Sequence, residues 1–89
     1  MTTTKTQKHI YTENELRAYL ETLNGVEYRI HTCDYFTGDS SEDPVAQLFS
    51  IDETVDYVVN NDANPFYVGL VGYEILVFNA NGYLESVIF

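Results

Sequence analysis

Two strand-forming segments joined by an Asn-Gly turn, near the end of the sequence, constrain the fold more than any other feature. Residues 73–78 are apolar at all but one position, and a second segment returns over 83–89 after Asn81-Gly82. An Asn-Gly pair between two such segments is a strong signal for a β-hairpin. Successive side chains of a strand point to opposite faces, so Tyr73 and Val77 are expected on the same face. We therefore predict an antiparallel hairpin over 73–89.

Two further strands are expected earlier in the chain, over residues 26–36 and 66–71. In the first, apolar and polar residues alternate from Val26 to His31, which predicts one apolar and one polar face. A β-bulge would reverse this alternation, so the face on which Cys33 lies stays open.

Two amphipathic helices are expected, over residues 13–24 and 51–60. Each begins with a capping box, in which two side chains satisfy backbone N–H groups at the start of the helix. Each also has one apolar stripe at helical spacing. Asn24-Gly25 supplies a left-handed stop for the first helix. The two capping boxes are Thr12 with Glu15 and Ser50 with Glu53.

The segments between these elements are less regular. Residues 1–10 are polar and rich in threonine, and are expected to form a flexible arm. Residues 37–44 consist mostly of turn formers and predict a loop. Residues 44–50 have two interpretations: a short helix with Asp43 as N-cap and Pro44 at its first position, or an apolar strand from Val45 to Phe49.

Together these elements predict an α+β fold, with an antiparallel sheet of about four strands and two amphipathic helices packed on one face. The chain has 89 residues, which is enough for a single domain over 1–89. Its hydrophobic content of 45% excludes a disordered acidic tail. Cys33 is the single cysteine, so no intramolecular disulfide can form.

Charge is strongly segregated along the sequence. The chain has 14 acidic and 4 basic residues, for a net charge of -10, and all four bases lie before residue 30. Such a charge disfavours direct binding to nucleic acid or to an anionic membrane, because phosphates repel it. The N-terminal residues have no apolar segment of the kind found in signal peptides. We therefore expect a cytoplasmic protein whose partners are basic.

Sites for catalysis or for metal binding are not predicted. His31 and Cys33 fall on the same face of a strand, but the sequence shows no third group to orient them as base and nucleophile. The spacing of Asp39, Glu42 and Asp43 does not match a calcium-binding loop. We expect no enzymatic activity, no cofactor and no metal.

The carboxylates of residues 34–62 are the candidate partner-binding site. Eight acids and no base lie in this segment. Asp52 and Asp56 are one helical turn apart, a rise of about 6 Å, comparable with the spacing of phosphates along a nucleic-acid strand. Tyrosine among carboxylates is typical of protein contact surfaces. Plain solvated surface is the alternative interpretation. The expected site is Asp34, Tyr35, Asp39, Glu42, Asp43, Asp52, Glu53, Asp56 and Asp62.

In these acids and in the hairpin over 73–84, the chain resembles the small acidic inhibitors of phages and mobile elements: anti-CRISPR proteins, antirestriction proteins and uracil-DNA glycosylase inhibitors. The Ser50-Ile51-Asp52-Glu53 segment is similar to a Glu-Ser-Ile segment of the glycosylase inhibitors, but Phe49 stands in place of the glutamate. No site residue is carried over from that family.

The resemblance implies a non-enzymatic inhibitor in the cytoplasm of a bacterial host cell. It would mimic nucleic acid and bind the basic channel of a defence complex such as a CRISPR effector. The alternative is an immunity protein, an antitoxin or an adaptor module that binds another basic protein. The oligomeric state is left open.

Overall fold

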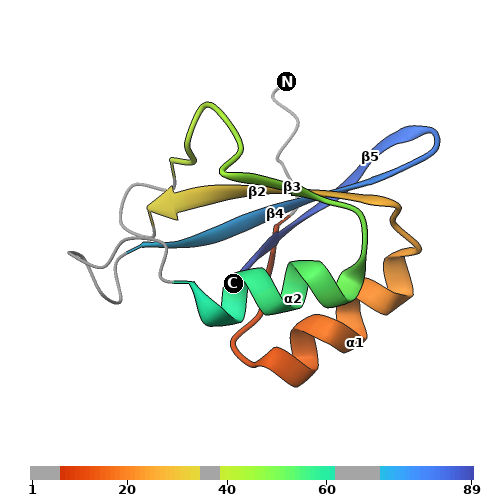
Figure 1. Cartoon of the computed structure of the whole chain (residues 1–89), viewed down its shortest axis with the longest axis horizontal. Helices are drawn as coiled ribbons and strands as arrows, with labels where there is room; N and C mark the ends of the chain where they lie inside the picture. The colour runs from red at the N-terminus through yellow and green to blue at the C-terminus, as the bar shows by residue number, and fades with distance from the viewer. Residues whose placement is uncertain (1–6, 35–38, 62–70) are drawn as a thin grey trace.

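The computed structural model describes residues 7–34, 39–61 and 71–89, which form an α+β fold. Two helices lie on one side of a sheet whose five described strands have the order β1-β5-β4-β2-β3 (Figure 1). This confirms the expected fold class, with one strand more than expected and one parallel pair. The elements are β1 Gln7–His9, α1 Glu13–Leu23, β2 Glu27–Asp34, β3 Ala46–Leu48, α2 Ile51–Asn60, β4 Val71–Asn79 and β5 Gly82–Ile88.

The predicted hairpin is formed by β4 and β5. Asn79 pairs with Gly82, so the turn consists of Ala80 and Asn81. Gly82 has a φ of 121°, a conformation that a side chain would disfavour. The alternation along β4 is also confirmed, because Tyr73 and Val77 both belong to the hydrophobic core. The predicted strand over 66–71 lies outside the described residues except for its last residue, which begins β4.

The β2 strand lies near the centre of the sheet and pairs with β4 from Glu27↔Phe78 to Asp34↔Val71 without a register shift. The absence of a bulge along this described pairing settles the question left open by the sequence. Tyr28 and Ile30 face the helices, whereas His31 and Cys33 point to the other side of the sheet. We call these the helix side and the far side.

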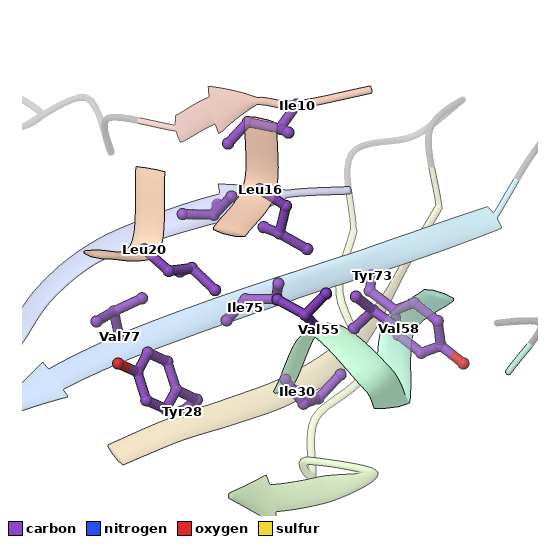
Figure 2. Close-up of a cluster of buried hydrophobic side chains, with 11 residues drawn as sticks. Ile10, Leu16, Leu20, Tyr28, Ile30, Val55, Val58, Tyr73, Ile75 and Val77 are labelled. Carbon is purple, nitrogen blue, oxygen red and sulfur yellow. The ribbon is translucent and has the colours of Figure 1, made fainter. Parts of the chain in front are cut away.

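The helix side holds a continuous apolar core. Leu16 and Leu20 from α1, together with Val55 and Val58 from α2, pack against the central strands (Figure 2). Full burial of one such side chain stabilises the fold by about 1.5–3 kcal/mol. The core is therefore the main source of stability, as the two amphipathic stripes predicted. Its buried members are Ile10, Leu16, Leu20, Tyr28, Ile30, Val55, Val58, Tyr73, Ile75, Val77 and Val87.

Both predicted helix starts are confirmed. Thr12 Oγ1 accepts a hydrogen bond from the Glu15 backbone N–H at 3.2 Å, and Ser50 Oγ accepts one from the Glu53 N–H at 3.1 Å. Two residues end α1, and each does so for a different reason. Asn24 takes the left-handed conformation with φ 54°. A Cβ on Gly25 would lie only 2.5 Å from Val77 Cγ1, so glycine is required there by close packing.

The N-terminal arm is where the structure corrects the sequence. Gln7–His9 are not flexible but form β1, which pairs in parallel with Ser86, Val87 and Ile88 of β5. Ile10 follows with 3% of its surface exposed, and its N–H donates to Ile88 O at 2.9 Å. Three polar residues carry no strand pattern, so only the neighbouring β5 makes them a strand. Residues 1–6 lie outside the described part of the chain.

The structure also decides between the two interpretations of residues 44–50. Ala46–Leu48 form β3, antiparallel to β2, so the strand interpretation is confirmed over these three residues. β3 ends the described strand order and is an edge of the described sheet. Neither described helix is long and apolar enough to cross a membrane.

Candidate functional site: two acidic patches and the strand between them

The predicted acidic site is divided by the sheet. The loop before β3 rises on the far side, whereas α2 lies on the helix side (Figure 1). Six of the predicted carboxylates are exposed and belong to these two groups. We call Asp39, Glu42 and Asp43 the loop patch, and Asp52, Glu53 and Asp56 the helix patch. Tyr35 and Asp62 lie outside the described residues, and Asp34 is half-buried at the end of β2.

The loop patch is held on the far side by hydrogen bonds to β2. The Asp34 N–H donates to Asp39 O at 2.8 Å, and the Ser41 N–H donates to Thr32 O at 2.8 Å. His31 Nδ1 lies 2.9 Å from Ser41 O. A carbonyl oxygen only accepts, so Nδ1 carries the hydrogen and His31 serves as a structural donor. The backbone carrying Asp39, Glu42 and Asp43 is thus anchored, while their side chains stay in solvent.

A buried carboxylate beneath this loop was not singled out from the sequence. Glu74 on β4 is 2% exposed and points to the far side. It accepts hydrogen bonds from Ser40 Oγ and from Ser86 Oγ, each at 2.6 Å. Glu74 therefore joins the loop to both strands of the hairpin. The signal was present in the sequence, because Glu74 is the one charged residue in an apolar strand.

The helix patch extends onto α1. Asp52 accepts a hydrogen bond and ion pair from the Arg17 guanidinium. This hydrogen bond, together with the negative charges of Asp52, Glu13 and Glu21, raises the pKa of Arg17. Sequence reasoning missed these two glutamates, although their positions four residues before and after Arg17 place them on its face of the helix. Glu13 and Glu21 therefore add acidic charge on α1 beside the helix patch.

Two members of the helix patch also stabilise α2. Glu53 accepts a hydrogen bond from Ser50 Oγ at 3.0 Å, and Asp56 accepts one from Asn60 Nδ2 at 2.7 Å. Acids in the first turn of a helix are favourable because they face the positive end of its dipole. The position of Glu53 in the first turn and the Asn60 contact of Asp56 are therefore explained by the helix itself, but both charges remain exposed to a partner.

The three basic side chains of the described residues all have partners. The Lys8 ammonium lies 5.6 Å from the centre of the Tyr19 ring. Arg17 pairs with Asp52. Arg29 donates to Glu27 Oε2 at 2.7 Å and stacks over the Phe78 ring at 4.4 Å. The Arg29 hydrogen bond lowers the pKa of Glu27. None of these three described bases is paired with Glu42 or Asp43, whose side chains are exposed.

Edge strand β3 runs between the two acidic patches. The loop patch precedes it in the chain and α2 follows it. Large apolar side chains flank it in solvent: Val45 is 47% exposed and Phe49 is 65% exposed. One of the two sequence interpretations placed these residues in an apolar strand, without indicating that they are exposed. Gln47, between them, donates to Glu27 Oε2 at 2.7 Å.

Two other features could hold chemistry: the His31–Cys33 pair and a groove beside β1. His31 and Cys33 are both buried on the far side, and His31 Nδ1 is committed to the loop. Among the described residues, no cluster of three or more His, Cys, Asp or Glu side chains is arranged to hold a metal ion. A mostly apolar groove of about 320 Å³ lies between β1 and α1. On its floor, Tyr19 donates a hydrogen bond to Glu85, which raises the pKa of Tyr19 to about 12.

Comparisons with protein-family models, with curated proteins and with solved structures found no match to this chain.

Proposed function

We propose that this protein is a non-enzymatic inhibitor that binds a basic, nucleic-acid-binding surface of a bacterial defence complex, such as a CRISPR effector complex in the host cytoplasm. It acts by occupying the surface that nucleic acid would otherwise occupy. The observation that carries the proposal is the segregation of charge. The described bases are engaged with partners inside the fold, while carboxylates remain exposed on both sides of one sheet edge.

The geometry supports an array of fixed charges rather than a flexible acidic tail. The loop patch is anchored to β2 through backbone hydrogen bonds, and the helix patch is carried by a capped helix. A pre-organised array loses less conformational entropy on binding than a flexible one. Complementary charge also accelerates encounter with a basic partner and makes the association rate sensitive to salt.

A competition assay tests the proposal. Purified guide-loaded CRISPR effector complexes, each bound to a fluorescent target oligonucleotide, are titrated with the protein. We expect displacement of the oligonucleotide from at least one complex, with an affinity that falls as salt rises. The Glu42→Lys and Asp56→Lys variants should each bind about tenfold more weakly, which corresponds to about 1.4 kcal/mol.

The matched control is Glu15→Lys, which makes the same charge change at an exposed position outside both patches. It should weaken binding much less than Glu42→Lys or Asp56→Lys. Equal losses in all three variants would show that net charge alone is responsible, and would reject the patches as the contact. Binding to a basic nuclease toxin without displacement from any effector would favour the immunity-protein alternative.

A further inference from the structure

The two acidic patches flank β3, the last strand of the described sheet, in the chain. Asp43 precedes the strand by three residues, and Asp52 follows it by four. The loop patch lies on the far side of the sheet and the helix patch on the helix side. The outer edge of β3 therefore offers a path along which one partner can contact both patches.

An edge strand presents backbone N–H and C=O groups that can pair with an added strand. β3 has β2 on one side and is the last described strand on the other. Natural edges are often protected by lysine or proline, but the sequence from Val45 to Phe49 contains neither. Instead, Val45 and Phe49 expose apolar surface at its two ends.

We propose that β3 binds an extended, lysine- or arginine-rich segment of the partner protein, which adds to the sheet as a sixth strand alongside β3. This proposal rests on the proposed function and specifies how the contact is made. Successive side chains of the added strand point to opposite sides of the sheet. Its basic residues on one side therefore meet the loop patch, and those on the other meet the helix patch.

Charge favours a basic segment beside β3 over a second copy of this chain. Pairing β3 with β3 of another molecule would bring together the acidic patches of two chains that each carry a net charge of -10. Like charges across an interface are strongly unfavourable. A basic segment turns the same carboxylates into attractive contacts, and an apolar residue within it would cover Phe49.

The probe is a synthetic peptide of about ten residues, the upper end of usual strand length, with lysines on both faces of the extended chain and two valines between them. Binding is followed by NMR of the isotopically labelled protein. We expect the largest amide shifts at Ala46, Gln47 and Leu48. A peptide with the same side chains but N-methylated at alternate residues keeps its charge and cannot complete the strand pairing, so it should bind at least about tenfold more weakly.

Phe49→Ser and Tyr11→Ser are the matched variants. Both remove an exposed aromatic ring: Phe49 is 65% exposed and Tyr11 is 82% exposed. Neither substitution should therefore disturb the fold. Phe49→Ser should weaken peptide binding several-fold, and Tyr11→Ser should leave it unchanged. The proposal is overturned if the N-methylated peptide binds equally well, if the shifts avoid β3, or if the two variants behave alike.

These outcomes separate the two proposals. In one outcome, an effector complex is inhibited by the original protein and by Phe49→Ser, but not by Glu42→Lys. This result would support the proposed function and reject strand addition. Peptide binding at β3 without inhibition of any effector would retain the edge site and reject the proposed function.

Discussion

The two sides of the sheet are both partly buried, but different physics holds each one together. On the helix side, β2 and β4 present Ile30 and Val77 to an apolar core closed by α1 and α2. On the far side, the same strands present His31 and Glu74, which are bound to the loop by hydrogen bonds. Because successive side chains of a strand point to opposite faces, each of these two strands contributes to both surfaces.

Because the two sides are held together differently, substitutions on each side should lower stability for different reasons. The apolar side depends on buried area and close packing, so lost volume is costly. The polar side depends on matched donors and acceptors, so a lost donor is costly only where water cannot replace it. The following predictions test this distinction in order of decreasing effect.

The largest effect is expected from Leu20→Ala on the helix side. Leu20 is fully buried in the core, and its truncation should lower the free energy of unfolding by about 2–5 kcal/mol. Urea denaturation measures the change. Leu84→Ala, on a partly exposed residue of β5, serves as the control and should cost much less. Equal midpoints for the two variants would mean that the core is assigned to the wrong face.

A smaller loss is expected from Gly25→Ala, which adds volume where Leu20→Ala removes it. The new Cβ would lie 2.5 Å from Val77 Cγ1, and Val77 is buried. Overpacking of this kind typically costs about 1–3 kcal/mol. Gly82→Ala separates packing from backbone strain, because its Cβ meets nothing within 4 Å but its φ is 121°. Unchanged thermal stability of Gly25→Ala would contradict the close approach of α1's end to β4.

On the far side, Ser86→Ala should cost more than Ser40→Ala. Both hydroxyls donate to Glu74 at 2.6 Å. Ser86 is fully buried, whereas Ser40 is exposed, so water can replace only the Ser40 donor. The expected loss for Ser86→Ala is about 1–3 kcal/mol, and for Ser40→Ala it is smaller. Chemical denaturation of both variants decides the order, and a reversed order would reject the assigned role of burial.

The smallest effect is a difference in pH dependence from Tyr19, which makes a polar contact on the helix side. Its hydrogen bond to Glu85 raises its pKa from the ordinary 10 to about 12. The folded protein therefore retains a proton that the unfolded chain loses, and stability should fall as the pH rises from 10 to 12. Tyr19→Phe should show a weaker decline in melting temperature over this range. Tyr28, whose pKa is raised by burial, is present in both proteins and cancels in the comparison.

The sequence was sufficient to predict elements whose defining residues are close neighbours in the chain. The N-caps Thr12 and Ser50 and the hairpin turn depend on neighbours in sequence. Both caps occur where they were predicted, and the turn lies at Ala80 and Asn81, with Gly82 already paired in β5. The apolar stripe of α1 likewise located Leu16 and Leu20 in the core. These features follow from backbone hydrogen bonding and side-chain periodicity, which a sequence displays directly.

The arrangement of charge and edges was decided only by the tertiary structure. Six exposed carboxylates from one acidic segment of the sequence divide into two patches, because the loop before β3 and the helix after it lie on opposite sides of the sheet. β1 became a strand only because β5 lay beside it, and Phe49 is exposed just after β3, the last strand of the described sheet. Local sequence patterns were enough to predict the helices, the hairpin and the sign of the charge. Long-range strand pairing decided where that charge faces, because pairing depends on partners far apart in the chain.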